Sequence, residues 1–524
     1  MKVRERNRED VRGVLGGTLS LTLSAIIVKL LGVIYKIPLA HILGEEGMGY
    51  FNSAYTVYAF FYLLCTAGVP KAVMILISEA EAKGRGEVGE RIVSVALRAF
   101  LIIGAVLTFI FVVFAAPLAH LIGNDKSMIT MIAVAPSMIF ISLSGVIRGC
   151  LSANMRFLTI AASQISEGVG KLVMGLILAL AASRAGLPLP IISAITMLGV
   201  SFGALLGLLH LYISARPIGS SRGVVSSEIL EIMRSIFRIS LPITISAAIM
   251  SITNIIDLSL IMRRLIAGGY SEIEATALYG NYTTLAVPMF NLAVSVISPV
   301  SIAFLPVFTR AAARQDTELG CGALRSALRM SAFLAAPIMI GMMVYSREIL
   351  SLLYGNIGID VGAPLLTLIS PAVFCTSILL VLNSYLEATG AVRAPVISMI
   401  VGSICKIFVS IFLISDPAVG ISGAPIGTLA CYVAALITSV IIAFGRTKVI
   451  LPIISSYAMP LVLSLAVIIP SESLYRLIAY RIGNTFAFLV IILTCAVLYL
   501  TLSLAVGIIG KKRVEELAKY TKTA

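Results

Sequence analysis

The sequence has no tryptophan, only three histidines and few charged residues. Charged side chains make up 12% of its 524 residues, whereas a soluble domain carries about 25%. Hydrophobic residues account for 59% of the chain, and the mean hydropathy is +1.05. The composition excludes a soluble protein, and the bilayer is the expected solvent for most of the chain.

The chain also lacks the sequence signatures of several kinds of site. Its seven cysteines form no CxxC and no cluster with His41, His120 or His210, so neither a disulfide framework nor a metal site is expected. No P-loop lysine and no GxGxxG opening a βαβ unit is present, so ATP-driven transport by this chain alone is not expected. The net charge of +14 lies mainly in short segments between apolar runs, which is typical of a membrane protein rather than a nucleic-acid-binding surface.

Apolar runs of about 20 residues, the length that spans a bilayer, dominate what is present. The sequence predicts an all-α integral membrane protein with about fourteen such spans: 14–37, 50–76, 92–115, 127–147, 157–183, 190–214, 236–262, 277–305, 323–346, 364–388, 394–414, 419–444, 451–470 and 484–508. The basic N-terminal segment resembles the start of a signal peptide. Because its apolar run is long and further spans follow, we expect it to be retained as the first span.

Lysine and arginine are distributed unevenly between the two sides of the membrane. With the N-terminus inside, 28 lie in cytoplasmic segments, seven lie in outer loops and four lie within spans. This bias predicts a multi-pass protein of the cell membrane with both termini in the cytoplasm.

An internal repeat relates the two halves of the chain. A shift of 235 residues places Leu151, Ser163 and Lys171 on Leu386, Ser398 and Lys406, in matching helix-loop-helix contexts. An even shift of six spans predicts a parallel repeat about an axis along the membrane normal, as in some transporters. The predicted organisation is listed in chain order: a cytoplasmic N-terminus (1–13), a six-helix bundle (14–214), a cytoplasmic linker (215–235), a second six-helix bundle (236–444), two extra spans (451–508) and a cytoplasmic tail (509–524).

Ionisable residues within spans are costly and usually face a cavity or a partner. Lys29 and Lys36 are seven residues apart and share one helical face about 10 Å apart, which suits a diphosphate or another anionic headgroup. Lys36 is near the outer end of its span, and snorkelling to the interface is the alternative for it. Lys29 lies deeper, and a water-filled cavity is expected around it.

A second set of charges lies in the repeated spans. Glu167 and Lys171 are four residues apart, so they form either an intrahelical ion pair or part of a substrate site. The repeat places Gly402 opposite Glu167 and keeps a lysine at Lys406, which lines a cavity or pairs elsewhere. The predicted substrate site comprises Lys29, Lys36, Asn52, Lys171, Asn281 and Lys406.

Asp257 is followed by Arg263 and Arg264 at the outer end of its span. Its carboxylate either binds a coupling cation or proton or makes a local contact, and Glu167 shares this choice between a coupling and a structural role. The two arginines are candidates for a gate. No cofactor is expected, and coupling to Na⁺ or H⁺ stays open.

Four stretches resemble the multidrug/oligosaccharidyl-lipid/polysaccharide (MOP) flippase superfamily, and within it the stage V sporulation protein B group of MurJ-like proteins. They are LGVIYKIPLAHILGEEGMGYF (31–51), TAGVPKAV (66–73), RGCLSANMRFLTIAASQISEGVGK (148–171) and LPITISAAIMSITNIIDLSLIMRRLIAGGYSEIEATALYGNYT (241–283). The resemblance covers about residues 10–445. Lys36 stands where the sporulation group usually has a basic residue in a Tyr-basic-Ile motif.

The resemblance implies two six-helix bundles around a central cavity, with two additional C-terminal helices. It also implies flipping of an undecaprenyl-diphosphate-linked sugar, such as the peptidoglycan precursor lipid II, by alternating access. The implied partners are this lipid-linked saccharide, membrane lipids and enzymes of cell-wall or polysaccharide synthesis. The implied process, whether growth, sporulation or capsule formation, stays open.

Two other functions are weighed against the flippase. A cation-coupled multidrug antiporter of the MATE type should have an acidic cavity, and the excess of lysines over acids within the spans disfavours it. A membrane glycosyltransferase or polymerase should carry clustered carboxylates on a sizeable loop. Glu45 and Glu46 are the only adjacent acidic pair among the predicted outer loops, so an enzyme is not expected.

Overall fold

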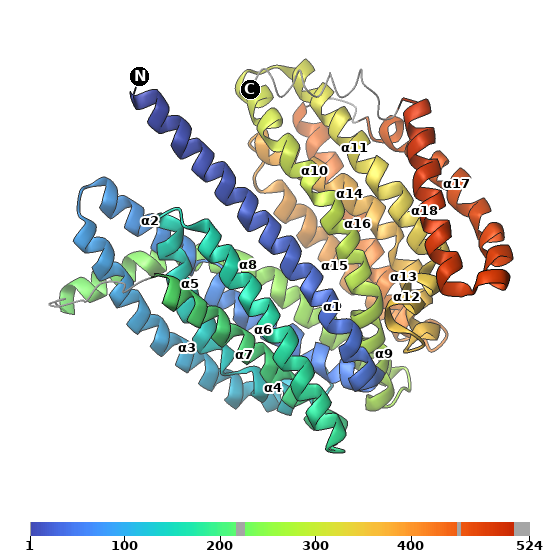
Figure 1. The fold of residues 1–524 in the computed structure, drawn as a ribbon, viewed down its shortest axis with the longest axis horizontal. Coiled ribbons are helices and arrows are strands. Elements are labelled where there is room, and N and C mark those ends of the chain that lie inside the picture. The colour runs from blue at the N-terminus through green and yellow to red at the C-terminus, as the bar shows by residue number, and fades with distance from the viewer. Residues whose placement is uncertain (1, 216–225, 448–451, 508–524) are drawn as a thin grey trace. The chain divides into compact units, whose positions relative to one another are not determined.

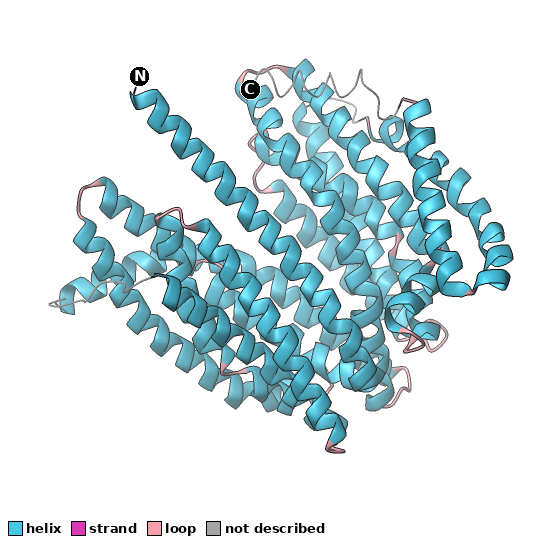
Figure 2. Ribbon diagram, in the orientation of Figure 1, coloured by secondary structure: helices cyan, strands magenta, loops and turns pink. Residues whose placement is uncertain are grey.

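The computed structural model describes residues 2–215, 226–447 and 452–507, and no strand occurs among them (Figures 1 and 2). Twelve of the described segments are long and apolar enough to cross a membrane. Such segments are helical because a helix satisfies every backbone hydrogen bond internally, which the lipid cannot do. The predicted all-α membrane fold is therefore confirmed.

The number of crossings depends on two helical segments. Ile26–Ala82 has 57 residues, which is enough for two crossings of about 20 residues each. α8 (Ser226–Ala267) contains the predicted span 236–262 but is not one of the twelve. A total of fourteen spans stays a prediction, as does the cytoplasmic location of the termini. The predicted tail 509–524 and residues 216–225 of the predicted linker lie outside the described residues.

The chain divides into two compact units. The first comprises Met1–Arg263 and Ser271–Gly280, and the second comprises Arg264–Tyr270 and Asn281–Ala524. The helices of the first unit are α1 (Lys2–Thr66), α2 (Val69–Ala82), α3 (Gly86–Ile122), α4 (Ser127–Val134), α5 (Ser137–Ala153), α6 (Phe157–Arg184), α7 (Leu189–Ala215), most of α8 and most of α9 (Glu272–Asn281). The boundaries of the two six-helix bundles, which come from the sequence repeat, stay a prediction.

Small residues allow close helix packing in the first unit. Gly199, Gly203 and Gly207 recur every fourth residue along one face of α7, which packs on α6. A Cβ at Gly199 would lie 2.4 Å from the Cα of Gly175 on α6. Glycine at both positions lets the two backbones approach, as is common between membrane helices. The packed helices α6 and α7 position Glu167 and Lys171, which both lie on α6.

α1 changes direction at Gly44, where φ is 65° and ψ is −170°. This backbone conformation is essentially restricted to glycine. The turn divides α1 into two helical arms, and side chains 16 residues apart on the two arms make contact, as Lys36 and Asn52 do. The break in α1 therefore builds part of the candidate site.

The second unit contains two short turns and nine α-helices among the described residues. They are the π-helical turn η1 (Tyr282–Ala286), α10 (Val287–Ala313), α11 (Thr317–Val344), α12 (Ser346–Tyr354), α13 (Ile359–Ile369), α14 (Pro371–Ala388), α15 (Ala394–Ile414), the 3₁₀ turn η2 (Gly420–Ser422), α16 (Gly423–Thr447), α17 (Ile453–Ile482) and α18 (Asn484–Ala505). One buried cluster joins α10, α11 and α14, with Phe308, Leu324 and Leu382 fully enclosed. α17 and α18 form a helical hairpin, and α17 packs on α11 (Figure 1).

Candidate functional site

Polar side chains gather where α1 meets α6 in the first unit. Lys36, on the first arm of α1, donates a hydrogen bond from Nζ to Oδ1 of Asn52 on the second arm, at 3.1 Å. Asn52 is only 4% exposed. An amide buried in an apolar bundle needs polar partners, and this contact orients the Lys36 side chain. The structure thus brings together two of the predicted site residues.

Lys171 of α6 lies against aromatic rings of α1. Its Nζ is 4.3 Å from the ring centroid of Tyr55 and 5.6 Å from that of Tyr35. The negative face of an aromatic ring attracts a cation at this distance. Asn52, which contacts Lys36, and Tyr55, which lies under Lys171, are three residues apart on the second arm of α1. Two cations therefore converge at the α1–α6 contact, a geometry that an anion would stabilise.

Tyr35 contributes a further polar atom to this site. The residue is 2% exposed, and its hydroxyl has no hydrogen-bond partner among the described residues. A buried hydroxyl without a partner costs about 1–3 kcal/mol. The Tyr35 hydroxyl is therefore one candidate donor to a ligand besides the two ammonium groups.

Glu167 pairs with Arg148, which lies one residue beyond the predicted span 127–147. Arg148 Nη2 donates to Glu167 Oε2 at 2.8 Å, and the two side chains are 11% and 25% exposed. The intrahelical Glu167–Lys171 pair, one of the two readings of that spacing, is not the contact that Glu167 makes. The reason is that α5 continues to Ala153, so Arg148 lies inside a helix. The helix extends six residues past the predicted end at residue 147, and no sequence signal had indicated this extension.

The remaining α1 candidate, Lys29, lies about two turns before Lys36. Its side chain is exposed, whereas Ser24, one turn earlier, is buried and donates to Gln164 of α6 at 3.0 Å. The first arm of α1 is therefore held against α6 by polar contacts. A substrate role for Lys29 stays a prediction.

Asn281 and Lys406 belong to the second unit. Asn281 is 2% exposed and packs against the backbone of Gly358. A Cβ at Gly358 would lie 2.1 Å from Oδ1 of Asn281. Lys406 of α15 is partly buried and lies within electrostatic range of Tyr432 on α16. That Asn281 and Lys406 share one cavity with Lys36 and Lys171 of the first unit stays a prediction.

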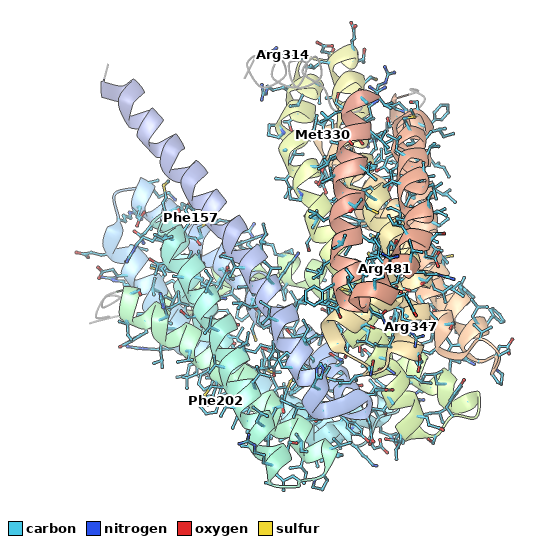
Figure 3. All side chains as sticks on the ribbon, turned by 45° about the vertical axis from the view of Figure 1, so that its right-hand side comes forward. Phe157, Phe202, Arg314, Met330, Arg347 and Arg481 are labelled. Carbon is cyan, nitrogen blue, oxygen red and sulfur yellow. The ribbon has the colours of Figure 1, made fainter. Side chains whose placement is uncertain are left out.

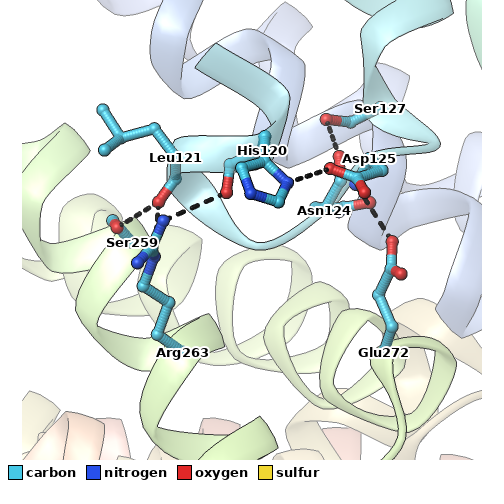
Figure 4. Close-up of polar contacts among 8 residues, drawn as sticks. All are labelled: His120, Leu121, Asn124, Asp125, Ser127, Ser259, Arg263 and Glu272. Atoms are coloured by element: carbon cyan, nitrogen blue, oxygen red, sulfur yellow. Dashed lines mark hydrogen bonds and ion pairs between the residues drawn. The ribbon is translucent and has the colours of Figure 1, made fainter. Parts of the chain in front are cut away.

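Arg263 caps the end of α3 within the first unit. Its Nε donates to the carbonyl of Leu121 at 2.7 Å and its Nη2 to that of His120 at 3.2 Å, while Ser259 Oγ donates to Leu121 at 2.7 Å (Figure 4). The last carbonyls of a helix lack intrahelical partners. Arg263 therefore fastens α8 to the C-terminus of α3.

The same end of the first unit holds a second contact. Glu272 of α9 accepts a hydrogen bond from the backbone N–H of Asp125 at 3.0 Å, and His120 Nδ1 lies 3.4 Å from Asp125 (Figure 4). Asp257 of α8 is partly buried. The gate role of Arg263 and Arg264 and the coupling role of Asp257 stay predictions. The described residues contain no group of three or more His, Cys, Asp or Glu that could hold a metal ion.

The chain is similar in sequence to a known family and to characterised proteins. Residues 14–312 match the family model described as polysaccharide biosynthesis protein. Stage V sporulation protein B of Bacillus subtilis (strain 168) is 22% identical over 418 residues, covering 78% of this chain and 79% of that protein. Lipid II flippase MurJ of Bacillus subtilis (strain 168) is 22% identical over 511 residues, covering 92% of this chain and 93% of that protein.

Solved structures show the same fold. Lipid II flippase MurJ in an inward closed conformation has a TM-score of 0.71 at 16% identity, over 92% of this chain and 97% of that one. An inward-facing multidrug resistance MATE family transporter of the MOP superfamily has a TM-score of 0.64 at 14% identity, over 83% of this chain and all of that one. The family match extends over more than half of the sequence and agrees with a fold of membrane-spanning helices. The chain is a multi-pass membrane protein that belongs to the polysaccharide biosynthesis protein family of the MOP flippase superfamily.

Proposed function

We propose that the protein is a flippase that moves an undecaprenyl-diphosphate-linked saccharide across the cytoplasmic membrane by alternating access. The observation that carries the proposal is the convergence of Lys36 and Lys171 beside a buried amide and two tyrosines in a membrane-embedded unit. Two neighbouring cations repel each other when the site is empty and are both stabilised when a diphosphate lies between them. The relatives named as flippases support the same substrate class.

Each residue has a role in this proposal. Lys36 and Lys171 bind the diphosphate, Asn52 holds the Lys36 side chain in place, and the Tyr35 hydroxyl donates to the headgroup. Glu167 is already paired with Arg148, so it does not cancel the two lysines. Transport requires no covalent step, and Na⁺ or H⁺ coupling through Asp257 and a gate formed by Arg263 and Arg264 remain parts of the proposal.

Binding of undecaprenyl diphosphate and of lipid II to the purified protein, measured by native mass spectrometry, tests the site. Lys36→Gln and Lys171→Gln should each weaken binding of both lipids roughly tenfold or more, because each removes a charge from a desolvated contact. Lys71→Gln is the matched control, since Lys71 is an exposed lysine at the start of α2. Variants that lose binding should also lose translocation of a fluorescent polyprenyl-diphosphate saccharide in proteoliposomes.

Equal binding by the wild type and both lysine variants would place the diphosphate elsewhere. Binding of lipophilic cations without binding of either diphosphate lipid would instead favour the cation-coupled multidrug antiporter. If undecaprenyl diphosphate binds and lipid II does not, the flippase proposal holds and the transported sugar differs from that of lipid II.

A further inference from the structure

An apolar cavity of about 490 Å³ lies in the second unit between α11, α17 and α18. α11 and α18 both pack on α17, and the space between them is lined by Gly341 of α11, Ile468 of α17 and Ile492 and Cys495 of α18. Its volume falls within the range of about 300–1,000 Å³ that ligand pockets occupy. The cavity is partly open and its walls are almost wholly apolar, so it suits a hydrocarbon chain.

Aromatic contacts brace this cavity at both ends. The Tyr499 hydroxyl donates to the carbonyl of Phe333 at 3.0 Å, and the two rings stack with centroids 5.3 Å apart. At the other end the rings of Tyr345 and Phe488 are 5.7 Å apart. A Cβ at Gly341 would meet no atom within 4 Å. The two aromatic contacts fix α18 to the α11 side at both ends, and the missing side chain at Gly341 leaves the space between them open.

A polar hollow of about 110 Å³ shares Phe488 with the apolar cavity. It is lined by Arg347, Glu348, Asn484 and Thr485. Figure 3 labels Arg347 near the end of α17 that carries Arg481. Arg347 also bonds the exposed Asp360 at 2.8 Å, which leaves its other guanidinium donors available to a second acceptor. The hollow therefore presents both signs of charge beside the apolar cavity, next to their shared residue Phe488.

We propose that the cavity and the hollow together bind one bilayer phospholipid with a zwitterionic, amine-bearing headgroup, namely phosphatidylethanolamine. An acyl chain fills the apolar cavity, the phosphate accepts hydrogen bonds from Arg347 and Thr485, and the ammonium group pairs with Glu348. An anionic headgroup offers Glu348 no partner, and a polyprenyl diphosphate brings negative charge to Glu348 without an ammonium group to pair with it. Charge complementarity selects the zwitterionic lipid.

The bound lipid acts on packing and not on transport chemistry. It ties α11 to α18 by filling the space between them, so occupancy stabilises the second unit by mass action. Lys36 and Lys171 lie in the first unit, so this lipid site and the substrate site stand or fall separately.

Native mass spectrometry of the full-length protein tests the lipid site. The protein is purified in mild detergent, stripped of lipid and titrated with phosphatidylethanolamine, phosphatidylglycerol and undecaprenyl diphosphate. Gly341→Phe fills the cavity, while Gly445→Phe is the matched control because a Cβ at Gly445 also meets no atom within 4 Å but lies on α16. Both changes replace a helical glycine with a better helix former, so the folded state should persist, and melting curves without lipid check this.

In the titration, the wild type should bind one phosphatidylethanolamine, and the complex should melt at a higher temperature than the protein without lipid. Gly341→Phe should weaken this binding roughly tenfold or more, Gly445→Phe should not change it, and Glu348→Gln should lower the preference over phosphatidylglycerol roughly two- to fivefold. If Gly341→Phe binds phosphatidylethanolamine as tightly as the wild type does, the cavity assignment is wrong. If the wild type prefers phosphatidylglycerol or undecaprenyl diphosphate at this site, the headgroup assignment is wrong. If it binds none of the three lipids, both the cavity assignment and the headgroup assignment are wrong.

Discussion

The Arg148–Glu167 ion pair gives the sharpest test of how charges are tolerated inside the first unit. Its donor and acceptor atoms are 2.8 Å apart and its side chains are 11% and 25% exposed. Glu167→Gln keeps the size of the side chain and an acceptor oxygen but removes the negative charge. The guanidinium of Arg148 then stays in an apolar setting without a counter-ion on α6.

Breaking a fully buried pair by removing one partner costs about 3–5 kcal/mol. Because Glu167 is a quarter exposed, we expect Glu167→Gln to lose about 2–3 kcal/mol of unfolding free energy. The double variant Arg148→Met/Glu167→Gln removes both charges and should recover most of that loss. A double-mutant cycle isolates the pairwise energy, which we expect to be about 2 kcal/mol.

Reversible unfolding in mixed lipid–SDS micelles, followed by a probe in the first unit, supplies the free energies. Glu79→Gln is the control, since it removes the exposed i,i+4 partner of Lys83 in the same unit, a kind of pair that contributes only a few tenths of a kcal/mol. If Glu167→Gln costs no more than this control, or if the double variant is no better than Glu167→Gln alone, the ion pair does not explain how the charges are accommodated.

Three further predictions concern helix contacts of the first unit. Tyr55→Leu should lose about 1 kcal/mol of unfolding free energy by removing the ring under Lys171, whereas Tyr55→Phe should lose much less, as measured in the same micelles. Arg263→Ala should speed amide hydrogen exchange in the last turn of α3, because the terminal carbonyls lose two donors; unchanged exchange would remove its capping role. Gly49→Ala should cost about 3 kcal/mol and lower the yield of monodisperse protein, since its Cβ would lie 2.1 Å from a carbonyl oxygen of α9, while Gly32→Ala, with no atom within 4 Å, should be tolerated.

Hydropathy was sufficient to predict the all-α membrane fold, because a spanning helix is specified by a local property, its length of apolar sequence. The helix ends were less predictable. Residue 148 lies just beyond an apolar run, and only the packing of α5 shows that the helix continues to Ala153 with Arg148 inside it. Local sequence cannot tell an arginine at a span end from one that a partner on another helix keeps inside, as Glu167 does.

The candidate site was predictable in its residues more than in its contacts. Lys36 and Lys171 were found because a lysine within an apolar run is costly and needs a reason. The contact of Lys36 with Asn52 depends on the turn of α1 at Gly44. The contact of Lys171 with Tyr55 depends on how α6 packs on α1. Both are tertiary facts with no periodic signal in the sequence.

The repeat explains how the two halves of the chain carry similar charge with different residues. Shifted by 235 positions, Arg148 falls on Asn383 and Glu167 on Gly402, while Lys171 falls on Lys406. A Cβ at Gly402 would lie 2.6 Å from a carbonyl oxygen of α16, so no carboxylate fits there.

The second half therefore lacks both charges of the ion pair at the matching positions. Asn383 accepts a hydrogen bond from Ser439 at 3.3 Å and needs no counter-ion. Losing the acid alone would have left a buried arginine without its partner, which is the costly case. At these three positions each half thus keeps one net positive charge, carried by Lys171 in the first unit and by Lys406 in the second. Under the proposed function, this shared positive charge suits a diphosphate headgroup, whereas it would repel a cationic substrate.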